Sequence, residues 1–155
     1  EVMADILTEK GIKSIALTVV LGLSCLHASA SEEAGVVKVS KGEVLIERGQ
    51  QQQAATVGSR IFSSDRVTTG ADSAVGITLR DNTLLSAGPN STIDLHKFSF
   101  DSTTHAGTID ATVKRGTLSV ISGKIAKATP QAVKFSAPGM TLGVRGTSFI
   151  IDAGQ

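Results

Sequence analysis

Beyond residue 35 the chain alternates apolar residues with polar or small ones, and this alternation constrains the fold more than any other feature. Val37 and Val39, for example, alternate with Lys38 and Ser40. The same period of two recurs in short runs at residues 44–47, 75–80, 93–95, 109–113, 118–120, 133–135, 142–144 and 149–151. Such runs have the length and period of β-strands, and no part of this region has the apolar spacing of an amphipathic helix. The sequence therefore predicts an all-β domain of short strands.

Turn-forming residues separate these runs. Glycine and asparagine supply positive φ angles and proline fixes φ, at residues 40–42, 48–49, 69–72, 80–82, 88–91 and 114–116. Sandwiches and solenoids both space their turns in this way, so a sandwich-like and a solenoid-like arrangement stay open. The glutamines of residues 50–53 are predicted to form an exposed loop tip, and residues 101–108 a longer polar loop.

The sequence contains one weak internal repeat. Residues 42–46 and 116–120 share the pattern Gly-x-apolar-x-apolar. Stacked coils would produce such a repeat, and so would chance similarity between two strands that each follow a glycine.

The first thirty residues have the three parts of a secretory signal peptide. Lys10 and Lys13 precede an apolar run at residues 14–26, and a small-x-small triplet with Ala28 and Ala30 follows. About 13 helical residues reach only ~20 Å, which is short of the ~30 Å hydrocarbon core. We therefore expect a signal-peptide helix over residues 1–30 and cleavage after Ala30.

Export then places one domain, residues 31–155, in the periplasm or outside a bacterial cell. Lipidation of Cys25, an uncleaved membrane anchor and a buried core helix are the alternatives for the apolar run. Cys25 is the only cysteine and would leave with the signal peptide. The mature domain would then have no disulfide, thiolate metal site or cysteine nucleophile.

Composition argues against several classes of function. Aromatic residues make up 3% of the chain, with no Trp and no Tyr, so a base-stacking surface or an aromatic platform for sugars is hard to build. The formal net charge of +1 gives no electrostatic footprint for nucleic acid.

Candidate catalytic and metal-binding residues are sparse. His96 and His105 are the histidines of the expected mature domain, and we interpret them as surface imidazoles because their spacing does not suggest zinc. Asp65 and Asp81 could form a carboxylate pair, but both occur at turns, where Asp side chains cap backbone N–H groups. No Gly-x-Ser-x-Gly elbow occurs. We expect no catalytic residue, metal or cofactor, and hence no enzyme.

Several longer motifs resemble the FecR domain. They occupy residues 57–61, 65–70, 75–84, 88–91, 115–118, 135–138 and 144–149. The last one, Val-Arg-Gly-Thr-Ser-Phe, is similar to the family's most recognisable element. The chain departs from the family pattern at Asn82, where Gly is usual, and at Ala137, where Thr usually precedes the proline.

The resemblance implies an all-β domain in which short strands stack as in a solenoid. FecR transducers of iron uptake carry a cytoplasmic helical segment that controls a sigma factor, followed by a membrane helix. The segment before residues 14–26 is too short for such a domain, so we expect a stand-alone exported FecR domain.

The motif residues are expected to be mainly structural. Asp65, Gly70, Asp81, Gly88, Pro89 and Gly116 are predicted to form or cap turns. For Arg145, Gly146 and Thr147 we favour a structural role and keep contact with a ligand or partner as the alternative.

From these features we expect an exported, non-catalytic protein that binds or scaffolds in the bacterial periplasm or cell envelope. Its partner would be an envelope protein or a cell-wall glycan, reached through exposed strand edges. Nucleic acid is not expected, and a membrane only through an uncleaved signal segment.

The main alternative is a regulatory component of an iron-uptake or cell-surface signalling pathway that acts with a separate anti-sigma or membrane partner. A carbohydrate-active enzyme on a β-solenoid is a third class, and it would require acids clustered on one face.

Overall fold

The computed structural model describes residues 31–144 and 148–154. The expected signal peptide, with Cys25, Ala28 and Ala30, lies outside the described residues, and so do Arg145, Gly146 and Thr147. Everything stated below about the structure concerns the described residues.

Strands dominate this part of the chain, which confirms the all-β prediction. In chain order they are β1 (Glu33–Lys41), β2 (Val44–Arg48), β3 (Gln51–Ala54), β4 (Arg60–Phe62), β5 (Arg66–Thr69), β6 (Ala74–Leu79), β7 (Leu84–Ala87), β8 (Thr92–Phe100), β9 (Gly107–Arg115), β10 (Thr117–Ile121), β11 (Val133–Ala137), β12 (Met140–Gly143) and β13 (Ser148–Asp152). A short helix α1 (Lys124–Ala128) and a 3₁₀ turn η1 (Pro130–Ala132) lie between β10 and β11.

The prediction of a loop at residues 50–53 is wrong, because Gln51–Ala54 is the strand β3. It pairs antiparallel with β2 after a tight turn at Gly49, whose φ is +61°. All four residues of β3 are exposed, so the pairing rests on backbone hydrogen bonds rather than on an apolar face.

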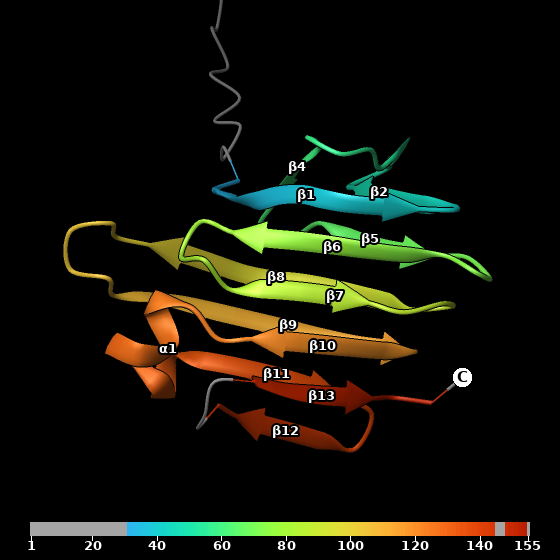
Figure 1. Ribbon diagram of the computed structural model, residues 1–155. Coiled ribbons are helices and arrows are strands. Elements are labelled where there is room, and N and C mark those ends of the chain that lie inside the picture. Colours follow the sequence, from blue (N-terminus) through green and yellow to red (C-terminus); the bar gives the residue numbers. More distant parts are fainter. Residues whose placement is uncertain (1–30, 145–147, 155) are drawn as a thin grey trace, which may run out of the picture.

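The strands form a six-stranded sheet, β13-β10-β7-β6-β1-β4, and a seven-stranded sheet, β12-β11-β9-β8-β5-β2-β3. Within each sheet the order follows the sequence, apart from β3 and β4 at one end. Figure 1 shows the strands stacked from β1 down to β12 and β13. The fold thus combines both predicted arrangements: it is a sandwich in which the chain advances along the stack as in a solenoid.

One continuous aliphatic core lies between the sheets. Alternate residues of the strands point inward, as in β6, where Val75, Ile77 and Leu79 are buried and the residues between them are only partly covered. Phe135 on β11 is the largest fully buried side chain. Its ring packs edge-on against the ring of Phe149, and the two ring centroids are 5.4 Å apart. Burial of alternating aliphatic side chains therefore holds the two sheets together.

Sharp corners carry the chain between the sheets at one end of the sandwich. Gly42, between β1 and β2, has a φ of +73° and faces Ser73. The hydroxyl of Ser73 accepts a hydrogen bond from the backbone N–H of Glu43 at 2.9 Å. The two corners at β1–β2 and β5–β6 are thereby tied together.

A second pair of corners repeats this arrangement. Gly116, between β9 and β10, has a φ of +77° and faces Ser91, whose hydroxyl accepts the N–H of Thr117 at 3.1 Å. The two copies of the Gly-x-apolar-x-apolar pattern therefore occupy equivalent corners. The weak sequence repeat corresponds to a repeated way of crossing between the sheets.

Replacing Gly116 by alanine should lower the free energy of unfolding by about 2 kcal/mol or more, because alanine is strained at this φ and its Cβ would collide with Ser91. Gly49→Ala is the matched control. It also has a positive φ but open space around it, so it should cost only about 1 kcal/mol. Urea denaturation measures both values, and equal losses would contradict a tight corner at Gly116.

Candidate functional site

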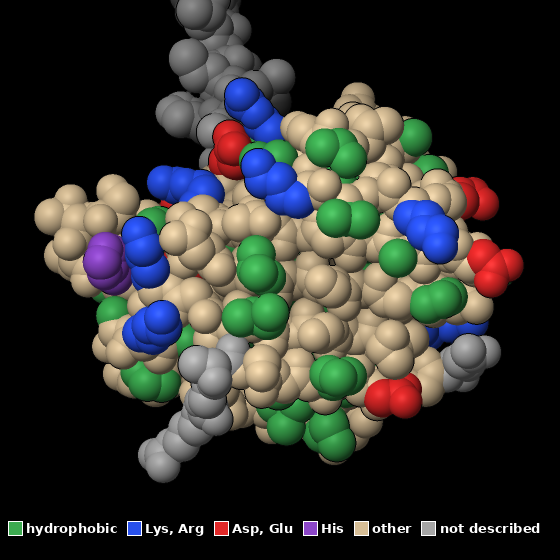
Figure 2. Space-filling model, in the orientation of Figure 1, with side chains coloured by type: hydrophobic (Ala, Val, Ile, Leu, Met, Phe, Trp, Pro, Cys, Tyr) green, Lys and Arg blue, Asp and Glu red, His purple; other side chains and the backbone are tan. Residues whose placement is uncertain are grey.

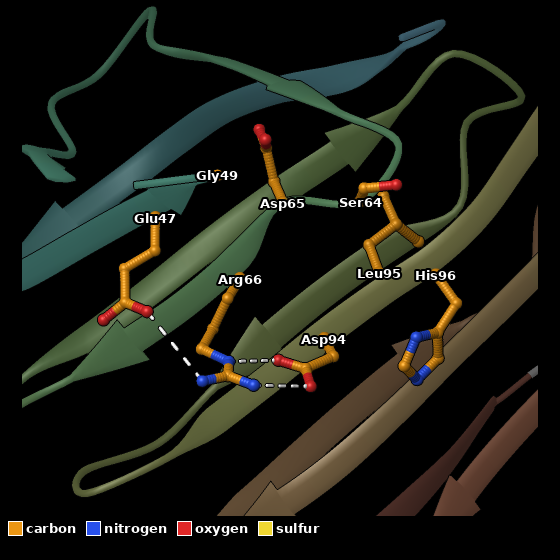
Figure 3. A pocket seen from close by; sticks show the side chains of 8 residues that line it. All are labelled: Glu47, Gly49, Ser64, Asp65, Arg66, Asp94, Leu95 and His96. Carbon is orange, nitrogen blue, oxygen red and sulfur yellow. Dashed lines mark hydrogen bonds and ion pairs between the residues drawn. The ribbon is translucent and has the colours of Figure 1, made fainter. Parts of the chain in front are cut away.

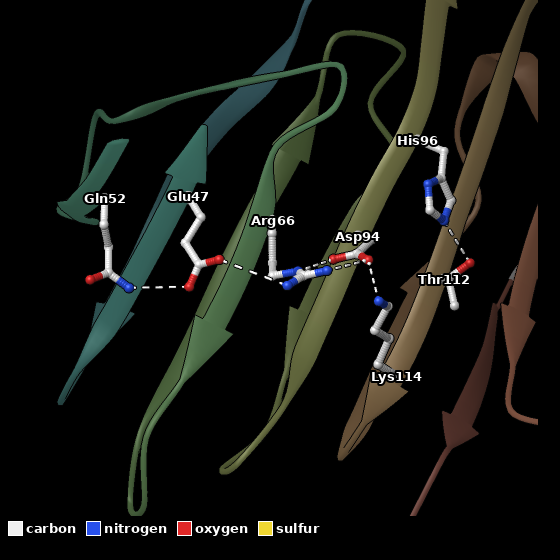
Figure 4. Close-up of polar contacts among 7 residues, drawn as sticks. All are labelled: Glu47, Gln52, Arg66, Asp94, His96, Thr112 and Lys114. Atoms are coloured by element: carbon white, nitrogen blue, oxygen red, sulfur yellow. Dashed lines mark hydrogen bonds and ion pairs between the residues drawn. The ribbon is translucent and has the colours of Figure 1, made fainter. Parts of the chain in front are cut away.

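A row of polar side chains crosses the outer face of the seven-stranded sheet. Strand register places Gln52 (β3), Glu47 (β2), Arg66 (β5) and Asp94 (β8) side by side, and Lys114 follows on β9. We call these five residues the polar row (Figure 4). They come from five different strands, and only the fold brings them together.

Hydrogen bonds and ion pairs link the polar row from end to end. The Gln52 side-chain amide donates to Glu47 at 3.1 Å, and the second Glu47 oxygen lies 3.9 Å from Arg66. Arg66 donates through Nε and Nη2 to the two oxygens of Asp94, at 2.5 and 3.0 Å. Lys114 Nζ lies 3.2 Å from Asp94 Oδ2.

Asp94 is the electrostatic centre of the row. Its side chain is 12% exposed, and the hydrogen bonds from Arg66 lower its pKa, an effect that burial opposes and Lys114 reinforces. The same hydrogen bonds raise the pKa of Arg66. Asp94 therefore stays ionised at neutral pH and fully engaged, which suits a fixed charge rather than a proton carrier.

A hollow of about 360 Å³ opens beside the polar row (Figure 3). It is lined by Glu47, Gly49, Ser64, Asp65, Arg66, Asp94, Leu95 and His96. Local irregularities of the backbone shape it, because Ser64 has a φ of +72° and the register of β8 against β9 shifts between Leu95 and Lys97.

The shift in β8 is a β-bulge that affects His96. Both His96 and its neighbour Lys97 face solvent as a result, and His96 Nε2 lies 2.9 Å from the hydroxyl of Thr112. Leu95 meanwhile bonds through its backbone to Ser64 and Asp65, at 2.7 and 3.0 Å. The bulge thus presents a histidine at the rim of the hollow.

Asp65 borders the hollow, but its carboxylate is fully buried and serves the fold. It accepts the backbone N–H of Phe62 at 2.8 Å, which closes the turn before β5. Arg48 adds two side-chain hydrogen bonds at 2.8 and 2.7 Å, and its guanidinium lies 4.3 Å from the centre of the Phe62 ring. Figure 3 shows the Asp65 side chain pointing away from Arg66 and Asp94.

The Asp81 side chain also accepts hydrogen bonds from its own turn. It accepts the backbone N–H and the hydroxyl of Thr83, at 3.1 and 2.8 Å, and the N–H of Ile125 at 3.2 Å. Asn82 adopts a φ of +67° where the family usually has glycine. Asp81 therefore ties the β6–β7 turn to the start of α1.

The remaining predicted turn residues lie at the opposite ends of these strands, near Gly116. Gly70 N–H bonds to the carbonyl of Glu43 at 2.9 Å, and Gly88 N–H to the carbonyl of Thr117 at 3.1 Å. Pro89 shares the turn with Gly88, and its carbonyl accepts the Ser91 hydroxyl at 3.3 Å. The structure thus gathers Gly70, Gly88, Pro89 and Gly116 at one end of the sandwich and places Asp65 and Asp81 at the other.

Sequence reasoning missed the polar row. Its five residues occupy outward positions of predicted or real strands, and a charge at such a position is ordinary on its own. The signal is their alternation in sign across neighbouring strands, which is visible only once the register is known.

The two histidines lie in different parts of the fold. His105 is in the β8–β9 loop, where its ring stacks on Phe100 with centroids 6.3 Å apart, whereas His96 is in the bulge. Within residues 31–144 and 148–154, no three His, Cys, Asp or Glu side chains converge as metal ligands. None of the helices in this part of the chain is both long and apolar enough to span a membrane.

Comparison with known proteins gives one match. Residues 65–155 match the family model described as FecR protein. No curated protein and no solved structure matches the chain. Strands β1 to β4 precede the matched residues, yet they pair within the same two sheets.

The Asp94→Asn substitution should lower the free energy of unfolding by about 1 kcal/mol at neutral pH, a modest value because Arg66 and Lys114 are half exposed and solvent screens them. The folded state depresses the Asp94 pKa, so its contribution is present above the unfolded value of about 3.9 and is lost as pH falls through the lower folded pKa. The stability gap between wild type and D94N should therefore shrink in acid.

Denaturation at pH 7 and at pH 3 or below tests this dependence. Asp72→Asn, at an exposed turn with φ of +53°, is the control and should change stability little. A gap for D94N that stays constant with pH would contradict a charge-based role for Asp94.

Proposed function

Because the chain belongs to the FecR family, whose membership suggests a role in cell-surface signalling, we propose that it is an exported, non-catalytic binding module of the bacterial cell envelope. The observation that carries this proposal is the polar row. It is a fixed set of alternating charges on a rigid sheet, with every carboxylate oxygen of Asp94 already hydrogen-bonded.

Occupied carboxylates favour binding over catalysis. A general acid or base must exchange a proton with its substrate, and the two oxygens of Asp94 are held by Arg66 and Lys114. Asp65, which also lines the hollow, is fully buried and engaged by Arg48 and Phe62. The third acid there, Glu47, accepts a hydrogen bond from Gln52 and lies 3.9 Å from Arg66. Each carboxylate oxygen of Asp94 and Asp65 thus already accepts a hydrogen bond, which favours a fixed charge over proton transfer.

The polar row favours a protein as the partner. Arg66 and Lys114 are 40% and 50% exposed, so they retain donors that can bond to a second molecule. Neighbouring strands are about 4.8 Å apart, so a complementary partner needs charges of opposite sign at the same spacing. A protein surface can supply that spacing, whereas glycans are commonly bound on aromatic platforms, which this composition disfavours.

A second function is favoured by the family assignment itself. In this second function the protein is a regulatory component of an iron-uptake or other cell-surface signalling pathway, and it acts with a separate anti-sigma or membrane partner. Unchanged inducible transcription after loss of the gene would argue against this function and leave a purely scaffolding role.

The first experiment is affinity capture from a bacterial envelope fraction, with and without peptidoglycan digestion. Wild-type protein should retain a discrete envelope protein after digestion. The double variant R66Q/K114Q should retain about tenfold less, because a row that has lost both cations no longer matches the partner.

The matched control is K38Q/K41Q, which removes the same charge from exposed positions of β1 in the other sheet. It should capture as much as wild type. Capture that requires intact peptidoglycan would identify a glycan ligand instead, and equal capture by both double variants would remove the polar row from the binding site. Circular dichroism confirms that each variant is folded.

A further inference from the structure

The charges of the polar row alternate in sign across neighbouring strands. In strand order they are negative, positive, negative and positive, at Glu47 on β2, Arg66 on β5, Asp94 on β8 and Lys114 on β9. Strand register sets the first three side by side, and the Lys114 ammonium lies 3.2 Å from Asp94. A row that alternates over an even number of charges has opposite signs at its two ends. Taken in reverse order, the polar row is therefore complementary to itself.

A two-fold axis would bring the row against its own reverse. With an axis parallel to the strands and midway between β5 and β8, the seven-stranded sheets of two copies stack face to face with their strand orders reversed. Glu47 then faces Lys114 of the second copy, and Arg66 faces Asp94 of the second copy. Symmetry repeats both pairs on the other side of the axis. All four charges thus face a charge of opposite sign.

The surroundings of the row fit the same arrangement. Gln52, at the β3 end of the row, faces β11 of the second copy, where the residue in this row is Ser136. Both side chains are uncharged. The next row of outward positions on one side is also uncharged and consists of Leu45, Thr68 and Thr92. The neighbours of the row therefore add no repulsion between like charges at these positions.

The hollow beside the row also gains an occupant. Ser64 precedes Arg66 by two positions, and the bulge of β8 lies at the same level because β5 and β8 are antiparallel. The two-fold axis therefore carries the exposed Lys97 of one copy over Ser64 of the other. The lining of the hollow contains three acids and one arginine, namely Glu47, Asp65, Asp94 and Arg66. A lysine matches this lining better than an acid would.

The outer face of the other sheet has no such pattern. None of the residues of its middle strands β6, β7 and β10 is charged. Figure 2 shows this face, with Lys, Arg, Asp and Glu side chains toward its rim and hydrophobic or other side chains across its middle. Charge complementarity therefore selects the seven-stranded sheet as the surface for a second copy.

On the basis of the proposed function, in which the row is a protein-binding surface, we propose that the polar row binds the polar row of a second copy of the chain to form a symmetric dimer. Packed sheets cross at about 30°, which displaces the outer pairs by about 4 Å over a row three strand spacings long. The long side chains of Glu47 and Lys114 span that displacement. Because the contacts are exposed ion pairs, the dimer should be weak and should dissociate as salt is added.

Sedimentation equilibrium of the purified protein tests for the dimer. Association should weaken about tenfold when the ionic strength rises from about 0.05 M to about 0.5 M. Glu47→Lys and Lys114→Glu should each weaken association about tenfold or more, because each sets like charges opposite one another on both sides of the axis. Lys41→Glu, a charge reversal at an exposed position of β1 in the other sheet, is the matched control and should associate like wild type.

A mixture of the two row variants tests the symmetry directly. E47K has positive charges at both ends of the row and K114E has negative charges at both, so each repels itself and attracts the other. Differently labelled E47K and K114E should form a mixed dimer about as tightly as wild type pairs with itself, measured by fluorescence energy transfer. The double variant E47K/K114E, in which the two end charges are exchanged, should again pair with itself. Circular dichroism confirms that each variant is folded.

Three results would overturn the proposal. They are a monomer at all concentrations up to about 1 mM in low salt, association that E47K and K114E leave unchanged, and a mixture of the two that does not pair. The proposed function fails separately. A monomeric protein that still captures an envelope protein through the row would refute only the dimer. A dimer whose R66Q/K114Q variant captures as much envelope protein as wild type would refute only the envelope partner of the row.

Discussion

The crossing of the chain between two sheets is the constraint on which the rest of this structure depends. Each crossing must reverse the backbone sharply while its N–H groups leave the ladder of a sheet and still find acceptors. Gly42 and Gly116 supply the positive φ, and Ser73 and Ser91 supply the acceptors. The serine lies so close that the glycine Cα faces it directly, so each pair excludes a side chain and replaces a lost ladder bond at the same time.

Three aspartates show how one residue type takes different roles in this fold. Asp65 and Asp81 each satisfy backbone N–H groups inside a turn, and both are buried. The Asp94 carboxylate is held by side chains rather than by the backbone N–H groups of a turn. It stands on the outer face of a strand between two cations, where its charge is shared across neighbouring strands. The roles differ because the residues lie in different surroundings: a turn offers free backbone N–H donors, whereas the face of a strand offers the side chains of neighbouring strands.

The sequence predicts the local features of this fold well and the distant ones poorly. Alternation identifies strands such as Ala74–Leu79, and glycine, asparagine and proline mark the corners, because both signals depend on neighbouring residues. β3 gives no such signal, since its glutamines form a strand only through pairing with β2. The polar row depends on the register of five strands, and the bond from Ile125 to Asp81 joins residues 44 positions apart. Neither can be deduced from spacing along the chain.

The match between strand order and chain order has a consequence for how the protein folds. A chain that emerges N-terminus first, from a ribosome or from a translocation pore, could lay each new strand onto a layer already formed, without waiting for its last residues. β6 joins β1, β7 joins β6, and β10 joins β7 in that sequence. The parallel contact of β11 with β9, reached through α1, joins Ile109 and Val133, which are 24 positions apart, whereas Val37 and Ile77 in the β1–β6 pair are 40 positions apart. Among the described strand pairs the longest loop closure would thus come early, when β6 joins β1, and later strands would add over shorter stretches of chain.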